Sequence, residues 1–343
     1  MIVLPKRRVL VVDDSAFIRQ LLVSIINACG DMEVVATAAD GSEAVRKAQE
    51  FKPDVITMDV EMPRMSGLAA LKEIMAERPT PVIMVSSLTV AGANETLQAL
   101  ENGAIDVVAK PKGALGMREL AEVLPQKLRA AASSRLTRQR GQSERRPHSN
   151  RPWAYDLVVV GCSTGGPAAL QKIIPALPED FPAPVVVAQH IPVGFTRPMA
   201  QRLDQQSRVQ VVEAMHQQVL RAGCVYIAPS GSHAAVKREQ NRAEISILPP
   251  ESSSSPFRPS VNVLFSSALP FAPRVLAVVL TGMGQDGLEG ARELHRAGAE
   301  IVAESEETSV VYGMPRVVVE AGLTERVLSL GEIVTFLSSP ANR

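Results

Sequence analysis

The chain is poor in cysteine, carries no excess of either charge and contains no long apolar run. Its 343 residues include only Cys29, Cys162 and Cys224, an odd number without metal-ligand spacing, so we predict no disulfide framework and a reducing compartment. Lys and Arg together number 36, as do Asp and Glu, and the zero net charge predicts no nucleic-acid partner. No run reaches membrane-spanning length, and residues 9–12 are too short for the apolar region of a signal peptide. We therefore expect a cytoplasmic protein without direct membrane insertion.

Short Val- and Ile-rich runs alternate with amphipathic, helix-length segments in both halves of the chain. They occupy residues 9–12, 33–38, 54–60, 82–85 and 106–109 in the first half, and 156–160, 185–189, 209–213, 225–229, 275–281 and 300–303 in the second. This alternation is typical of parallel sheets covered by helices, so both halves are predicted to be α/β. Residues 127–152, rich in Lys, Arg, Ser and Gln, are predicted to be a flexible basic linker. Residues 225–227 and 245–248 are expected to pair as a hairpin, and residues 252–255 to form a loop.

Acidic residues follow two of the predicted strands in the first half. Asp13 and Asp14 come directly after the first strand, Asp59 lies near the end of the third, and Lys110 follows the fifth. Because the carboxyl ends of parallel strands meet at one edge of a sheet, these groups are expected to converge there. Three carboxylates need a cation to remain ionised together, and their oxygen ligands favour Mg²⁺. A carboxylate beside such an ion can accept a phosphoryl group, with Asp59 as the predicted nucleophile and Lys110 offsetting the charge.

A hydroxyl after the fourth strand is the candidate for coupling an added phosphate to a change of shape. Ser86 is the first choice, and its neighbour Ser87 is the alternative. For the aspartates, the competing explanation is that they are helix caps or turn residues. The segments LVVDDS (residues 10–15) and MDVEMP (residues 58–63), together with Lys110, resemble the receiver domain of two-component response regulators. The resemblance implies a flavodoxin-like (βα)5 receiver domain over residues 1–126, phosphorylated on Asp59 by a histidine kinase.

A glycine-rich turn in the second half carries a serine. The segment GCSTGGP (residues 161–167) follows a predicted strand and precedes a helix that Pro167 can start, which places Ser163 at a helix N-terminus. Unpaired backbone N–H groups there could hold an oxyanion formed at this serine. A plain helix cap and a phosphate-binding turn are the alternatives, although the glycine spacing matches neither the dinucleotide fingerprint nor a P-loop. This segment alone leaves the choice open.

Two further strand ends supply possible partners for the serine. His190 follows the run at residues 185–189, and an imidazole can accept the serine proton and return it to a leaving group. Asp286 lies in TGMGQDG (residues 281–287) after another buried run, where an Asp-Gly turn or a helix cap is the competing explanation. Three such residues after three strands of one parallel sheet favour a Ser-His-Asp triad.

Several motifs of the second half resemble the CheB family of chemotaxis protein-glutamate methylesterases. They are GCSTGG (residues 161–166), QHIP (189–192), TGMGQDG (281–287) and YGMP (312–315). The resemblance implies a catalytic domain over residues 153–343, with a doubly wound, mostly parallel α/β hydrolase-type fold. The residues that it implies for the site are the triad Ser163, His190 and Asp286, with Thr164 as a positioning residue and the Met283 backbone N–H in the oxyanion hole. The family usually has Asp where this chain has Asn262, which leaves the role of that position open.

The resemblance also implies an activity and its partners. It is a phosphorylation-activated hydrolysis of glutamyl methyl esters on chemoreceptors, and deamidation of receptor glutamines, in bacterial chemotaxis. The esterase chemistry itself needs no cofactor. A DNA-binding regulator is one alternative, but the second half has no helix-turn-helix signal and no basic face. A catalytically inactive docking scaffold is another, and the sequence does not separate it from the enzyme.

Overall fold

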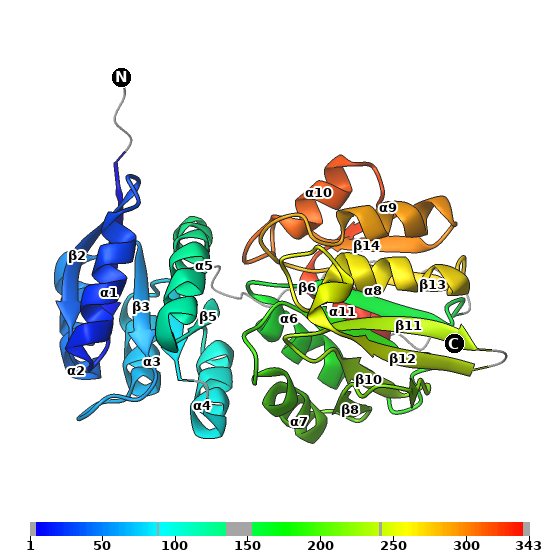
Figure 1. Ribbon diagram of the computed structural model, residues 1–343, viewed down its shortest axis with the longest axis horizontal. Coiled ribbons are helices and arrows are strands. Elements are labelled where there is room, and N and C mark those ends of the chain that lie inside the picture. Colours follow the sequence, from blue (N-terminus) through cyan, green and yellow to red (C-terminus); the bar gives the residue numbers. More distant parts are fainter. Residues whose placement is uncertain (1–4, 88, 135–152, 240–241, 339–343) are drawn as a thin grey trace. The chain divides into compact units, whose positions relative to one another are not determined.

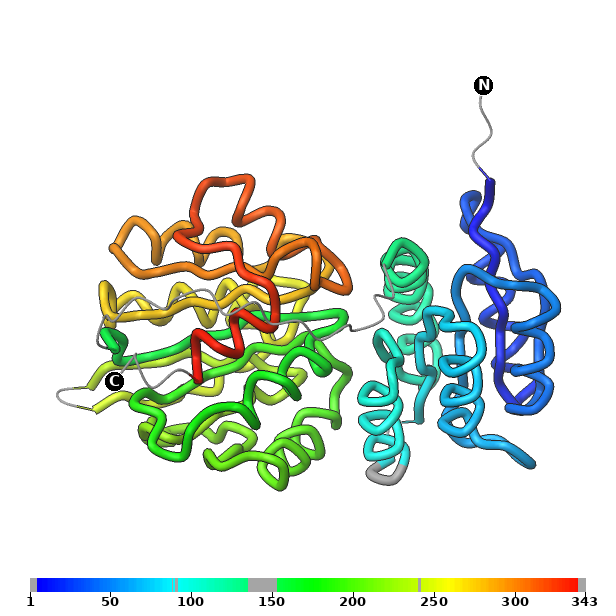
Figure 2. The backbone as a smooth tube through the Cα atoms, turned by 180° about the vertical axis from the view of Figure 1, so that it is seen from behind, coloured from blue at the N-terminus to red at the C-terminus, as the bar shows by residue number. Residues whose placement is uncertain are grey.

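The computed structural model describes residues 5–87, 89–134, 153–239 and 242–338. The chain divides into two compact units, Met1–Leu136 and Thr137–Arg343, drawn as ribbons in Figure 1 and as a backbone tube in Figure 2. No helix in these described ranges combines the length and apolarity needed to cross a bilayer.

The first unit is built on a five-stranded parallel sheet in the order β2-β1-β3-β4-β5. Its strands are β1 (Arg7–Val12), β2 (Met32–Ala38), β3 (Val55–Asp59), β4 (Val82–Ser86) and β5 (Asp106–Ala109). Every residue of β3 and β4 is buried, because helices cover both faces, and this explains their continuous apolar runs. All five strands predicted for this half are confirmed.

Five helices cover the two faces of this sheet. α1 (Ala16–Asn27) and α5 (Gly113–Ser133) pack together on one face, and α2 (Gly41–Phe51), α3 (Gly67–Glu77) and α4 (Val90–Glu101) lie side by side on the other (Figure 1). The side chains of Ser15, Asp40, Ser66 and Thr89 each accept a hydrogen bond from a backbone N–H in the first turn of α1 to α4, respectively. These caps satisfy donors that the helices themselves leave unpaired.

Helix α5 extends beyond residue 126, where the sequence predicted the linker to begin, so that boundary was placed too early. The helix continues to Ser133 because its end is packed and paired: Lys127 forms a buried ion pair with Asp106 at 2.9 Å, and Ala131 is fully buried. The rest of the predicted linker, residues 135–152, lies outside the described residues.

The second unit is built on a seven-stranded parallel sheet in the order β15-β14-β13-β6-β7-β10-β8. Its strands are β6 (Leu157–Cys162), β7 (Val185–Gln189), β8 (Gln210–Glu213), β10 (Cys224–Ile227), β13 (Val275–Val279), β14 (Glu300–Glu304) and β15 (Arg326–Leu328). One face carries α6 (Gly166–Ile173), α7 (Thr196–Gln206) and α11 (Leu330–Ser338), and the other carries α8 (Val261–Ser267), α9 (Leu288–Arg296) and α10 (Met314–Glu320).

A separate three-stranded antiparallel sheet packs beside α8 in this unit. It has the order β11-β12-β9, with β9 (Gln218–Val219), β11 (His233–Glu239) and β12 (Arg242–Leu248). The predicted hairpin was therefore wrong: β12 pairs with β11 and β9, whereas β10 lies between β7 and β8 in the main sheet. All four residues of β10 are buried, and the interior of the parallel sheet provides that environment.

Both parallel sheets have a point at which the connecting helices change from one face to the other. It lies between β1 and β3 in the first unit and between β6 and β13 in the second. Loops diverge at such a point and leave a crevice outside the carboxyl ends of the strands, where ligands bind in this class of fold. Asp13 and Asp59 lie at the carboxyl ends of β1 and β3, and Ser163 directly follows β6.

Candidate functional site

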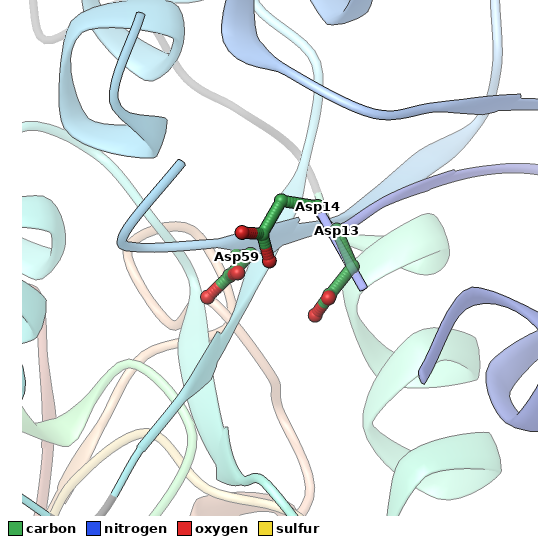
Figure 3. A group of neighbouring side chains, drawn as sticks. All are labelled: Asp13, Asp14 and Asp59. Atoms are coloured by element: carbon green, nitrogen blue, oxygen red, sulfur yellow. The ribbon is translucent and has the colours of Figure 1, made fainter. Parts of the chain in front are cut away.

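The first unit gathers three carboxylates at the carboxyl ends of β1 and β3. Carboxylate oxygens of Asp13, Asp14 and Asp59 all lie within 4.8 Å of one another (Figure 3). Asp13 and Asp59 are buried, whereas Asp14 is exposed. The Lys110 ammonium lies 2.7 Å from Asp59 Oδ2 and 3.0 Å from Asp13 Oδ2. The structure thus brings together all four residues that the sequence assigned to this site.

Burial dominates the electrostatics of this cluster. It raises the pKa of Asp59 to about 6, because the hydrogen bond from Lys110 only partly offsets the lost hydration and the neighbouring Asp13 charge adds to it. Burial raises the pKa of Asp13 in the same way. For Lys110, burial works against the charge, but hydrogen bonds to Asp59 and Asp13 raise its pKa nevertheless. Three carboxylates facing one ammonium leave excess negative charge, and their oxygens suit a hard divalent cation such as Mg²⁺.

The two hydroxyl candidates after β4 have different surroundings. Ser86 is fully buried, and its Oγ accepts a hydrogen bond from Thr96 Oγ1 at 2.8 Å and lies 3.3 Å from the Gly92 carbonyl oxygen, which it can donate to. Ser87 is half-buried and its Oγ lies 3.3 Å from Thr89 Oγ1. Ser86 therefore connects the end of β4 directly to α4.

Ser163 lies in the turn that joins β6 to α6 and is buried. Its backbone N–H donates to the Thr281 carbonyl at 3.1 Å, and the Thr281 hydroxyl donates to the Thr164 carbonyl at 2.9 Å. The N-cap of α6 is Gly165, at a φ of 82°, so Ser163 precedes the helix and does not cap it. Gly282 must lack a side chain, since a Cβ there would lie 2.9 Å from the Ser163 Cβ. The turn is thus held against the end of β13.

His190 and Asp286 are in direct contact. His190 Nε2 lies 2.9 Å from Asp286 Oδ2, and its side chain is 9% exposed. The His190 backbone N–H donates to the Cys162 carbonyl at 3.0 Å, which places His190 beside the residue that precedes Ser163. His190 Nδ1 is buried and has no hydrogen-bond partner within the described ranges. One imidazole nitrogen is therefore oriented by a carboxylate and the other is available to accept a proton.

The Asp286 carboxylate is held by the start of α8 as well as by His190. Ser260 Oγ and the Asn262 N–H donate to Oδ1, both at 3.0 Å, and the Val261 N–H donates to Oδ2 at 2.7 Å. Burial on its own would raise the pKa of Asp286, but the hydrogen bond from His190 and those from the α8 backbone lower it below its usual value. Asp286 thus caps a helix other than the one that follows it and remains ionised beside the imidazole.

Asn262 performs the reciprocal function at the start of α9. Its Oδ1 accepts hydrogen bonds from the N–H groups of Gly287 and Gly290, both at 3.0 Å. An amide oxygen accepts these bonds as a carboxylate would, so the geometry at this position needs an acceptor and not a charge. Asparagine at this position is therefore compatible with an intact site.

Gln189 is a buried site residue that the sequence did not single out. Its side-chain Nε2 donates to the carbonyls of Ser163 and His190, both at 2.9 Å, and its Oε1 accepts from Cys162 Sγ at 3.0 Å. One amide therefore links the backbone of the candidate nucleophile to that of the candidate base. The available signal was an amide at the end of an otherwise apolar buried strand.

Comparisons with known proteins match both units of the chain. A family model described as CheB methylesterase matches residues 158–337, and one described as response regulator receiver domain matches residues 9–122. A protein-glutamate methylesterase/protein-glutamine glutaminase from Symbiobacterium thermophilum is 45% identical over 355 residues, spanning 95% of this chain and 94% of its own. A Thermotoga maritima relative of the same name is 46% identical over 326 residues, spanning 94% of each. The crystal structure of the Thermotoga maritima CheB methylesterase catalytic domain matches with a TM-score of 0.52 at 40% identity, covering 54% of this chain and 97% of that one.

Proposed function

The chain belongs to the CheB methylesterase family and carries a response regulator receiver domain, and we propose that phosphorylation of Asp59 controls ester hydrolysis by Ser163, His190 and Asp286. The enzyme is a protein-glutamate methylesterase, as its relatives are named. The observation that carries the triad is the 2.9 Å contact between His190 and Asp286 at the sheet edge where the buried Ser163 turn begins.

Ser163 Oγ attacks the carbonyl carbon of a γ-glutamyl methyl ester in the proposed reaction. His190 takes the serine proton on Nδ1, because Nε2 is engaged by Asp286, and it passes that proton to the departing methanol. Water then hydrolyses the glutamyl-serine ester and restores the free hydroxyl. The Met283 N–H supplies an oxyanion donor in this proposal, and Thr164 helps position the turn.

The proposed substrates are side chains of chemoreceptors. Each turnover would convert one methylated glutamate to a free carboxylate, which is the adaptation step in bacterial chemotaxis. The relatives are also named glutaminases, and the same acyl transfer with ammonia as leaving group would deamidate a receptor glutamine. The three cysteines are free thiols, which supports a cytoplasmic location.

The receiver site is proposed to accept a phosphoryl group on Asp59 from a histidine kinase. Asp13, Asp14 and Asp59 would hold Mg²⁺, which when bound neutralises charge on the carboxylates and the incoming phosphoryl oxygens. Lys110 already contacts both buried carboxylates and adds a fixed positive charge beside the acceptor oxygen.

Ser86 is the proposed coupling hydroxyl. A phosphate on Asp59 gives Ser86 Oγ a charged acceptor, and reaching it would require Ser86 to leave Thr96 and Gly92 in the first turns of α4. Phosphorylation would thereby shift α4 and relieve a restraint that the unphosphorylated receiver places on the esterase, which is a population shift between two states.

Methanol release from a methylated receptor fragment tests the proposal. Ser163→Ala should abolish release, whereas Ser207→Ala at the end of α7 should not change it. Beryllofluoride should raise the rate of the wild-type protein and leave Asp59→Asn unaffected. Continued release by Ser163→Ala would remove the triad assignment, and a wild-type protein without turnover would favour the docking scaffold.

A further inference from the structure

An aromatic ring lies flat against the imidazole of His190. The ring centroids of Phe257 and His190 are 4.3 Å apart, and the two planes differ by 4°. Phe257 comes from the segment between η2 (Pro250–Ser252) and α8, two residues after the stretch at residues 252–255 that the sequence predicted to be a loop. Asp286 contacts the imidazole at its edge, so the base has a carboxylate at one edge and an aromatic face against its plane.

The loop is anchored on both sides of Phe257. The Phe257 N–H donates to Ser255 Oγ at 3.2 Å, and the Arg258 carbonyl accepts from the Gly231 N–H at 3.2 Å. These bonds fix the backbone immediately before and after the stacked ring. The ring therefore meets the imidazole in a defined orientation and not as a loosely placed cover.

A buried histidine connects the start of the same loop to the site. The Ser260 N–H donates to His233 Nδ1 at 3.2 Å, so the proton of the neutral ring lies on Nε2 and points at the Pro250 carbonyl, 3.3 Å away. His233 is fully buried. It joins the loop that carries Phe257 to Ser260, whose hydroxyl holds Asp286, so the two groups that contact His190 share one support.

The face of a phenyl ring is electron-rich and attracts a cation placed over it. In the proposed reaction His190 is neutral when the ester binds and becomes an imidazolium as it takes the serine proton. Phe257 therefore interacts more strongly with the charged form than with the neutral one. An interaction that strengthens in this way lowers the barrier and not merely the energy of the bound substrate.

We propose that Phe257 acts on the esterase reaction through His190, because its ring face stabilises the imidazolium form of that base. The inference rests on the triad proposed above, because it requires His190 to be the base. This role differs from simple packing because the side chain at position 257 must be aromatic. An aliphatic side chain of similar volume cannot replace it.

The test compares Phe257→Leu with Phe257→Tyr in the full-length protein, with beryllofluoride present and a small γ-glutamyl methyl ester as substrate. We expect Phe257→Leu to lower kcat about three- to tenfold with little change in KM. The acid limb of the kcat/KM profile should move to lower pH by about half a unit, because the imidazolium has lost a stabilising contact. Phe257→Tyr keeps the ring face, so its kcat and the position of its acid limb should match those of the wild type.

A readout without turnover completes the experiment. The His190 Cε1–H resonance, identified by its loss in His190→Gln, should show the same downward shift of its titration midpoint in Leu and none in Tyr. Equal behaviour of Leu and Tyr would overturn the proposal, as would a change confined to KM, which would make Phe257 a substrate contact. If Ser163→Ala or His190→Gln kept full activity, the assignment of the triad would be wrong. That result is distinct from one in which only the proposed role of Phe257 is wrong.

Discussion

Asp59→Asn should stabilise the first unit at neutral pH in the absence of divalent cations. The Asp59 carboxylate is buried, so its ionisation raises the free energy of the folded state. Asp13 adds further negative charge, and Lys110 compensates only in part. Asparagine has nearly the same shape, and its amide oxygen can still accept from Lys110. The substitution therefore removes the buried charge while keeping the packing.

The magnitude follows from the pKa. Burial raises the pKa of Asp59 from 3.8 to about 6, and about 1.4 kcal/mol accompanies each pH unit of such a shift. Because the folded-state pKa lies above the unfolded one, the stability is greatest below about pH 4 and is lost as the pH rises through 6. The ionised carboxylate thus costs up to about 3 kcal/mol at pH 7.5, and Asn should recover about 1–3 kcal/mol there and little at pH 4.

Native-state hydrogen exchange of peptides from β1 and β3 measures this unit by itself. Fluorescence is blind to it, since Trp153 and the three tyrosines, Tyr155, Tyr226 and Tyr312, all belong to the second unit. Denaturation followed at Trp153 is therefore an internal control that should not change. Asp14→Asn, which removes an exposed carboxylate of the same cluster, should alter the exchange by far less than Asp59→Asn.

Two results would contradict the reasoning. One is an Asp59→Asn protein whose first unit exchanges like the wild type at pH 7.5 in EDTA. The other is a stabilisation of equal size at pH 4 and pH 7.5, which would exclude titration of Asp59 as its source. Adding Mg²⁺ should reduce the difference in stability between the wild type and Asp59→Asn. At a concentration of 100 Kd it should stabilise the wild type by about 2.7 kcal/mol and the variant by less.

Substitutions at three residues test the second unit. Gln189→Met keeps the side-chain length but removes the amide donor from the carbonyls of Ser163 and His190, of which Ser163 still accepts from the Gly166 N–H at 2.8 Å. Unfolding followed at Trp153 should therefore show a loss of about 1–3 kcal/mol, and kcat should fall about tenfold or more. Asp286→Asn should lower kcat at saturating ester by about 10- to 100-fold, because the charge beside the imidazole is lost. The variant should also be less stable than the wild type, and this difference in unfolding free energy should shrink as the pH falls below about 4, because the wild-type carboxylate then becomes protonated and its lowered pKa no longer stabilises the fold. Asn262→Asp preserves the acceptor for α9 and should keep kcat within about threefold, whereas Asn262→Leu should cost about 1–2 kcal/mol of unfolding free energy.

The amino-acid sequence by itself determined the fold class and where the reactive side chains gather. Buried parallel strands must be apolar throughout, so the polar residues that end them stand out, and their carboxyl ends share one edge. The order of residues along the chain was therefore enough to group Asp13, Asp59 and Lys110, and likewise His190 and Asp286. Each of these residues adjoins a strand whose period and composition are local properties of the chain.

Only the tertiary structure decided how those side chains are supported and oriented. It assigned Nε2 of the imidazole to Asp286, placed the Gln189 amide between two backbones and laid Phe257 on the ring of His190. It also extended α5 and moved β10 into the main sheet. These features depend on contacts between segments far apart in the chain, and such contacts leave no local periodicity because packing selects them only after the sheets and helices have come together.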